Sequence, residues 1–279
     1  MDNDVWDLVT LPKGAKPIGC KWIFKTKRDS KGNVERFKAR LVAKGFTQKE
    51  GIDYKETFSP VSSKDSFRII MALVAHFDLE LHQMDVKTAV LNGDIDETIY
   101  MRQPEGFVSG DPDNMVCKLK KSIYGLKQAS RQWYFKFHQV IISFGFEMNM
   151  VDDCVYHKFS GSKHIFLVLY VDDILLASND IELLHDTKRF LAKHFEMKDL
   201  GDASFVMVSK YIGLVLVVFL DYRRRTISKR FSSVMGCTTV NRVIPLWLKE
   251  ISSVSISALK MILRKRKLRR FPMPRQWEV

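Results

Sequence analysis

The sequence predicts an α+β fold, in which amphipathic helices pack on a small antiparallel sheet. Three segments carry apolar residues at helical spacing, and several short apolar runs are separated by turn-forming residues, as in neighbouring strands. The length of 279 residues allows one or two domains with a sizeable core, and 46% of the residues are hydrophobic.

The first expected elements are a hairpin, a helix and a strand. Residues 17–27 and 34–44 are strand-like, and the run 29–33 between them is rich in turn-forming residues. A helix is expected over residues 63–77, and a short strand over 79–86 follows it. The helix is indicated by apolar residues at helical spacing: Phe67, Ile70, Met71, Val74 and Phe77.

Two more helices and three more strands are expected in the second half. The helix over residues 130–144 should place Trp133, Phe137 and Ile141 in the core. The helix over 180–195 can be capped by Asn179 or Asp180. Its inward residues should be Ile181, Leu184, Leu191 and Phe195. The expected strands cover residues 154–159, 165–171 and 174–178.

Composition excludes several classes of protein. The four cysteines form no CxxC pair and no disulfide framework, so a reducing compartment is expected. No signal peptide opens the chain, and the longest late apolar run, residues 211–220, is half of the roughly 20 residues that a membrane helix needs. We therefore expect no membrane partner.

The pattern that points to chemistry is Tyr170-Val-Asp-Asp173, with apolar residues on both sides. A hairpin between two buried strands would place Asp172 and Asp173 at its tip. Buried unpaired carboxylates are costly, so the tip should face water, a metal or a cation. Paired carboxylates on a rigid hairpin suit the binding of two Mg²⁺ ions. The alternative is a hairpin with two solvated turn acids. Asp85, which closes the strand over 79–86, can reach the same sheet edge.

Five blocks of sequence carry a family resemblance, in family order. They are VWDLVTLPKGAKPIGCKWIFKTKRDSKGNVERFKARLVAKGFTQKEGIDYKETFSPV, LHQMDVKTAVLNGDIDETIYMRQPEGF, VCKLKKSIYGLKQASRQWY, LYVDDILLAS and FEMKDLGDASF. Together they resemble the reverse transcriptase of copia-type LTR retrotransposons over residues 5–206. The resemblance implies a right-hand polymerase with palm and fingers, the thumb missing. The fingers would cover about 1–78 and 98–125, and the palm about 79–97 and 126–206.

The resemblance also implies the roles of the acidic residues. Asp85, Asp172 and Asp173 match the catalytic, metal-binding trio of the family, in which the first two bridge both metals. The implied cofactors are two Mg²⁺ ions, with Mn²⁺ as an alternative. The implied partners are an RNA or DNA template-primer and deoxynucleoside triphosphates. The oligomeric state is left open.

Further residues match positions that contact the substrate in the family. Lys38 or Arg40 would hold the triphosphate, although a solvated strand face is the alternative. Gly125, Lys127 and Gln128 would lie under the templating base pair, although a helix entry turn is the alternative.

Val90 departs from the family pattern DVKTAF, in which an aromatic residue ends the motif. In related enzymes that aromatic side chain leaves no room for a ribose 2′-hydroxyl. Val90 is smaller, so it should weaken the selection of deoxynucleotides.

The last segment, residues 207–279, does not resemble the family. It holds 16 Lys+Arg and 3 Asp+Glu, whereas residues 1–207 hold 29 of each, so the net charge of +13 comes from the tail. A basic patch for nucleic acid or nuclear import is one interpretation. We favour another, because codons for residues 238–262 read one base out of frame allow DCKPGDTPVAKGDKFSLNQCPKN, which is family-like. The tail is then an out-of-frame translation, and it should be poorly ordered.

The sequence therefore predicts a fragment of an RNA-directed DNA polymerase from a copia-type element, truncated and inactive as it stands. One alternative is a non-catalytic polymerase-fold protein that binds nucleic acid. Another is a decayed element whose product has no cellular role. The parent element would act inside the cell, in the cytoplasm or in a virus-like particle.

Overall fold

The structure is a computed structural model that describes residues 4–29, 31–111 and 114–203. The described chain divides into two compact units. The first unit comprises residues 4–60, 86–144 and 193–196, and the second comprises 61–85, 145–192 and 197–203. The tail from residue 207, with its expected change of frame and poor order, lies outside the described residues.

The second unit is built on a six-stranded sheet with the order β11-β4-β10-β9-β8-β7. The central strands are β4 (Glu80–Val86), β10 (Asp173–Ser178) and β9 (Lys163–Tyr170). The outer strands are β7 (Glu147–Met148), β8 (Val155–Ser160) and β11 (Met197–Asp202). The four strands expected in this unit are confirmed as β4, β8, β9 and β10.

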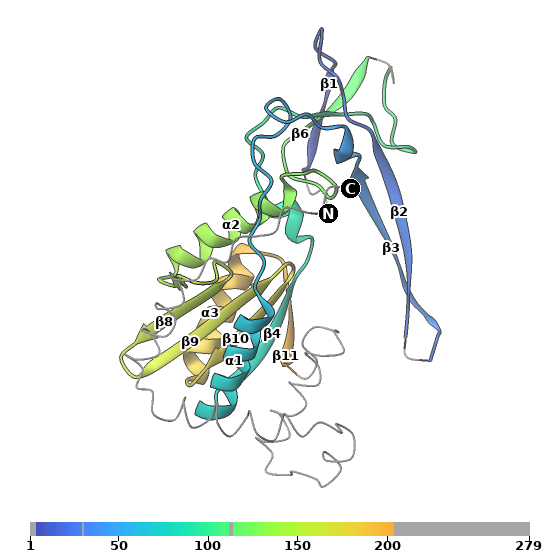
Figure 1. Ribbon diagram of the computed structural model, residues 1–279. Coiled ribbons are helices and arrows are strands. Elements are labelled where there is room, and N and C mark those ends of the chain that lie inside the picture. The colour runs from blue at the N-terminus through green and yellow to red at the C-terminus, as the bar shows by residue number, and fades with distance from the viewer. Residues whose placement is uncertain (1–3, 30, 112–113, 204–279) are drawn as a thin grey trace, which may run out of the picture. The chain divides into compact units, whose positions relative to one another are not determined.

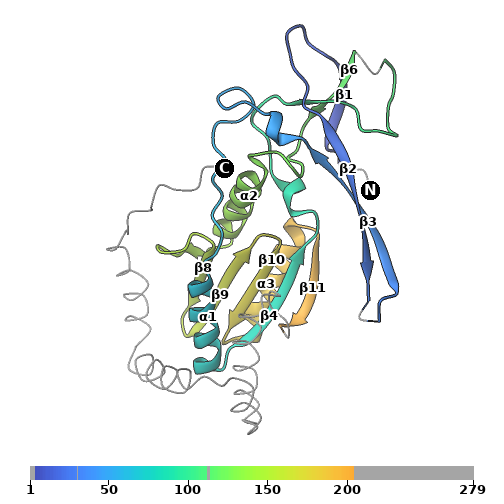
Figure 2. The same ribbon diagram turned by 45° about the vertical axis from the view of Figure 1, so that its right-hand side comes forward.

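Helices α1 (Lys64–Phe77) and α3 (Ile181–His194) cover opposite faces of this sheet (Figures 1 and 2). Leu81 of β4 packs in the apolar cluster that Phe67 of α1 lines, whereas the next residue, His82, contacts Lys188 of α3. Successive side chains of a strand point to opposite faces, so the two helices lie on opposite sides. The middle of β9 is buried for this reason.

Helix α1 begins at a conventional cap. Ser63 Oγ accepts a hydrogen bond from the backbone N–H of Ser66 at 3.1 Å, which satisfies one of the free N–H groups of the first turn. The helix ends where Asp78 adopts a left-handed conformation with φ of 50°. Four of the five apolar residues that indicated this helix are buried: Phe67, Ile70, Met71 and Val74. The fifth, Phe77 at the last helical position, is 38% exposed.

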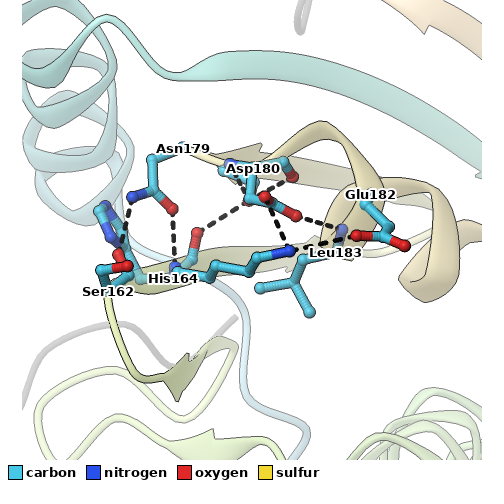
Figure 3. A network of polar contacts seen from close by, with 8 residues as sticks. Ser162, His164, Asn179, Asp180, Glu182 and Leu183 are labelled. Atoms are coloured by element: carbon cyan, nitrogen blue, oxygen red, sulfur yellow. Dashed lines mark hydrogen bonds and ion pairs between the residues drawn. The ribbon is translucent and has the colours of Figure 1, made fainter.

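Helix α3 is fixed where the β9–β10 hairpin leads into it (Figure 3). Asp180 Oδ1 accepts from the N–H of Leu183 at 2.8 Å, so Asp180 is the cap. Asn179 Oδ1 instead accepts from the N–H of His164 on β9 at 2.7 Å. The hydrogen bond from Leu183 lowers the pKa of Asp180, and Lys163, which pairs with Asp180 at 3.0 Å, lowers it further.

The inward face of α3 was predicted with one error. Leu184 and Leu191 are fully buried, and Phe195, just after the helix, is 4% exposed. Ile181 is 49% exposed, because the buried stripe begins one turn later, at Leu184.

The first unit contains a three-stranded sheet of order β1-β6-β5. Its strands are β1 (Trp6–Thr10), β6 (Met115–Leu119) and β5 (Tyr100–Met101). We did not predict this sheet, because its strands are only two to five residues long. Short 3₁₀ helices η1 (Gly45–Thr47) and η2 (Ala89–Asn92) also belong to this unit.

Helix α2 (Ala129–Ser143) of the first unit confirms the predicted helix. Trp133, Phe137 and Ile141 are buried, as expected. The ring of Trp133 contacts that of Phe195 edge-on, with 5.2 Å between centroids.

The predicted hairpin is a two-stranded ribbon of β2 (Cys20–Arg28) and β3 (Val34–Ala43). At its turn, Asp29 Oδ1 accepts hydrogen bonds from the N–H groups of Lys31 and Asn33. The register and the alternation of side chains give the ribbon two different faces. One face holds six cations: Lys21, Lys25, Lys27, Arg36, Lys38 and Arg40. The other holds Trp22, Phe24 and Phe37.

Candidate active site

The acidic hairpin has a two-residue turn, Val171 and Asp172, between β9 and β10. Tyr170 pairs with Asp173 across this turn. Val171 has a φ of 55°, which is rare for a β-branched residue. Strained backbone of this kind concentrates at functional sites, where the surrounding structure holds it. The predicted hairpin with two acids at its tip is confirmed.

Asp85 of β4 lies directly opposite Asp173 of β10 in the antiparallel register. Residues paired in this way point to the same face, with Cβ atoms roughly 4.5–5.5 Å apart. Both side chains are half-buried. The structure therefore brings Asp85 and Asp173 together at one end of the sheet, with Asp172 adjacent in the turn.

Gln83 is a residue of this site that the sequence analysis missed. It lies two residues before Asp85, on the same face of β4, and its Nε2 donates to Asp173 Oδ1 at 3.0 Å. Alternation along the strand was the signal that could have found it. Burial raises the pKa of Asp173, the Gln83 hydrogen bond opposes this, and the negative charge of Asp85 raises the pKa further. The net effect is a raised pKa, so Asp173 is ionised at a cost.

The donor set fits a divalent cation. Carboxylate oxygens are the ligands that Mg²⁺ prefers, and a cation would relieve the repulsion between Asp85 and Asp173. Among the described residues, no group of three or more His, Cys, Asp or Glu side chains is arranged to hold a metal by itself. Mg²⁺ usually takes only one or two carboxylates and completes its shell with water and substrate phosphates.

Lys38 and Arg40, the predicted triphosphate ligands, lie on the cationic face of the ribbon in the first unit. Both side chains are half-buried. The guanidinium of Arg40 lies 5.3 Å from the centre of the Tyr124 ring, an attractive cation–π distance. This contact holds Arg40 in place on the ribbon.

The loop before α2 has mainly internal contacts. Gly125 has a φ of +91°, and a Cβ there would lie 2.2 Å from the carbonyl oxygen of Ala43, so the close approach that this glycine permits is to β3. Lys127 Nζ donates to the hydroxyl of Tyr54 at 3.0 Å. Contacts of these two residues with a ligand stay a prediction.

Gln128 has the internal contacts of a structural residue. It is 1% exposed, and its Oε1 accepts from Gln48 Nε2 at 3.0 Å. Its Nε2 donates to the carbonyl of Asp53 at 2.9 Å and to Glu97 at 3.3 Å. Its side-chain amide is therefore already satisfied within the protein, which favours the interpretation as a helix entry turn.

Val90 lies in η2 and is 9% exposed. It packs in an apolar cluster of the first unit that includes Ile99, Met101 and Ala129. Its role in sugar selection stays a prediction.

These observations first define a class. In this α+β fold, two neighbouring strands of the sheet each carry a carboxylate, and the adjoining turn carries a third. Such a group of carboxylates suits the binding of divalent metals and phosphoryl transfer. In comparisons with known proteins, the model of the family "Reverse transcriptase (RNA-dependent DNA polymerase)" matches residues 3–241. The chain belongs to this reverse transcriptase family. The matched range continues past residue 206, where we expected the resemblance to end.

The curated relatives are polyproteins of transposons. The chain is 51% identical over 211 residues to the retrovirus-related Pol polyprotein from transposon TNT 1-94 of Nicotiana tabacum. The aligned segment covers 75% of the chain and 16% of that polyprotein. It is 43% identical over 198 residues to the retrovirus-related Pol polyprotein from transposon RE1 of Arabidopsis thaliana, and this alignment covers 71% of the chain and 14% of the relative. The chain thus spans about a sixth of the length of these relatives. None of the helices in the described ranges is long and apolar enough to cross a membrane.

Proposed function

We propose that the chain contains the palm and fingers of an RNA-directed DNA polymerase of a copia-type element, which adds deoxynucleotides to a primer 3′-hydroxyl. The observation that carries this proposal is the placement of Asp85 opposite Asp173, next to Asp172 in a strained turn. Membership of the reverse transcriptase family supports the same reaction.

In this proposal Asp85 and Asp172 hold two Mg²⁺ or Mn²⁺ ions, and Asp173 assists. When bound there, the ions would lower the pKa of the primer hydroxyl and neutralise charge on the triphosphate. Gln83 orients Asp173 through its hydrogen bond. The chain itself contributes positioning and charge, which is what phosphoryl transfer mainly requires.

The proposed palm covers about residues 79–97 and 126–206, and the proposed fingers cover about 1–78 and 98–125. The six cations on one face of the β2–β3 ribbon support a role in holding anionic substrate, with Lys38 or Arg40 on the triphosphate. The template-primer and deoxynucleoside triphosphates are the proposed partners.

We also propose that the chain as it stands is an inactive remnant, because its tail reads as out-of-frame translation. Extension of an oligo(dT) primer on poly(rA) with Mg²⁺ should then be absent for the chain itself and present once the frame is restored. In the restored enzyme, Asp172→Asn should abolish extension, whereas binding of template-primer should persist. The matched control, Asp96→Asn, changes an exposed acid of the first unit and should leave extension unchanged.

Metal binding can be measured without activity. Mn²⁺ should bind the chain, as followed by electron paramagnetic resonance, and Asp85→Asn and Asp172→Asn should each weaken binding. If Asp172→Asn binds Mn²⁺ and extends primers like the parent, the catalytic assignment is wrong. Binding of nucleic acid with neither metal binding nor extension would favour the non-catalytic alternative.

A further inference from the structure

A second polar cluster lies on the other face of the sheet, and the proposed function gives it no role. It consists of Lys188 on α3, His82 on β4, and Asp199 and Asp202 on β11, and we call it the Lys188 cluster. Lys188 Nζ lies 2.5 Å from His82 Nδ1 and 2.9 Å from both carboxylate oxygens of Asp199. His82 Nε2 lies 3.2 Å from Asp202 Oδ1. The Lys188 side chain is only 9% exposed, although it is charged.

The cluster attaches an edge strand. β11 ends the sheet and pairs with β4 alone. Four of its six residues are exposed and two are half-buried, so β11 has little apolar packing to hold it. Two of its side chains, Asp199 and Asp202, enter the Lys188 cluster. These polar contacts add to the backbone pairing that joins β11 to β4.

The hydrogen count determines the state of His82. A lysine ammonium has only donors, so the ring nitrogen that faces it must accept. Nδ1 of His82 is that nitrogen, which leaves the ring hydrogen on Nε2, where it donates to Asp202. The closed cluster thus requires a neutral His82. Protonation would place a hydrogen on Nδ1, directed at an ammonium 2.5 Å away.

The charged and titratable groups around His82 come from three elements. Lys188 and His185 belong to α3, Asp199 and Asp202 belong to β11, and Glu80 lies on β4 itself. Burial is the largest cause that lowers the pKa of His82 from 6.5, and Lys188 lowers it further. The three carboxylates act in the opposite direction, and the net shift is downward.

We propose that the Lys188 cluster is a proton-sensitive latch, in which protonation of His82 breaks its contact with Lys188 and releases edge strand β11 from β4. This inference does not depend on the proposed function. Because His82 binds a proton less readily in the closed state, the closed state is fully favoured above pH 6.5 and weakens as the pH falls. One coupled proton changes the equilibrium by up to about ten-fold for each pH unit.

Hydrogen–deuterium exchange of the full chain tests the latch. After correction for the intrinsic exchange rate, protection of the peptide that covers residues 197–202 should fall by up to about five-fold between pH 6.5 and 5.5. Protection of the β9–β10 hairpin should stay constant over this range. Constant protection of residues 197–202 would overturn the proposal.

Two matched variants assign the effect to His82. His82→Asn keeps an acceptor near the position of Nδ1 but cannot titrate, so protection of β11 should no longer depend on pH. His185→Asn removes the neighbouring, exposed imidazole on α3 and should keep the response of the parent chain. A parent-like response in His82→Asn would contradict the proposal. If this variant does not fold, ¹⁵N spectra of the parent chain decide, because hydrogen on Nδ1 of His82 at pH 7.5 would contradict it as well.

Discussion

Asp173 is held in its place at a cost to stability. Its carboxyl is half-buried and lies opposite Asp85, and both features raise its pKa above 3.8. For an acid with a raised pKa, ionisation favours the unfolded state. The destabilisation is absent well below pH 3.8, grows as the pH rises toward the folded-state pKa, and is complete above it. Such a cost is common at functional sites, where activity requires what folding does not.

We therefore expect Asp173→Asn to raise the melting temperature at pH 7. The amide keeps an oxygen that can accept from Gln83 and removes the charge. The gain over the parent chain should shrink as the pH is lowered through the folded-state pKa toward 3.8, because Asp173 then loses its charge in the folded state. Thermal melts from pH 3.5 to 7 measure this difference, with the exposed Asp96→Asn as the control. A melting temperature lowered at pH 7 would contradict the expected repulsion.

Val90 tests the proposed sugar selection. In a frame-restored enzyme, Val90→Phe should lower the incorporation of ribonucleotides relative to deoxynucleotides, because an aromatic ring would fill the space for the 2′-hydroxyl. The measurement is the ratio of incorporation efficiencies for one ribonucleotide and its deoxy counterpart.

Val90 is also buried, so the larger ring should cost about 1–3 kcal/mol through overpacking. A thermal melt separates this loss from the change in selectivity. An unchanged ratio in a folded variant would mean that Val90 does not lie at the sugar.

One carboxylate in the loop before β8, that of Asp152, binds the N-terminal turn of helix α1. Asp152 Oδ2 accepts from Ser62 Oγ at 3.2 Å, from the N–H of Ser63 at 2.9 Å and from Ser66 Oγ at 2.5 Å. Its Oδ1 accepts from the N–H of Cys154 at 3.0 Å. The acceptor is an anion beside the N-terminus of a helix, where negative charge is favourable.

Removal of this carboxylate should therefore destabilise the second unit. Asp152→Ala is expected to cost about 3 kcal/mol, because hydrogen bonds to charged groups are strong and the freed donors lose their partner. The measurement is the urea midpoint by circular dichroism. Asp153→Ala changes the adjacent, exposed acid and should cost less. Equal losses would show that the contacts of Asp152 are not what holds α1.

For the whole molecule, the proposed loss of reading frame is tested by the DNA that encodes the chain. We expect a family-like frame one base upstream from codon 208 onward, which includes DCKPGDTPVAKGDKFSLNQCPKN over the codons for residues 238–262. Direct sequencing gives the answer, and the in-frame codons for residues 5–206 are the internal control. Unrelated residues in the shifted frame would contradict the proposal. The family model matches residues up to 241, which includes the start of the tail. The DNA of residues 208–241 is therefore the part that best distinguishes a lost reading frame from an in-frame tail.

The sequence by itself determined the α+β class, the three long helices and the acidic hairpin. These features depend on neighbours a few residues apart: apolar spacing in α1, the Asp180 cap of α3, and two apolar runs around Asp172 and Asp173. The same local reasoning failed at Ile181, which lies at the end of a helix and is 49% exposed. It also missed the sheet of β1, β5 and β6, whose strands are too short to show a period.

Only the tertiary structure decided which residues meet. Asp85 and Asp173 lie 88 residues apart in the chain, and only the register of β4 with β10 places them opposite each other. The same register brings Gln83 within hydrogen-bond distance of Asp173. The contacts of Gln128 and those of the Lys188 cluster also join residues that are far apart in the sequence. A local pattern states which face of a strand is buried, but a shift in pairing would change every cross-strand partner. Packing between distant segments selects one register. The chemistry of the acidic site and of the Lys188 cluster follows from that register.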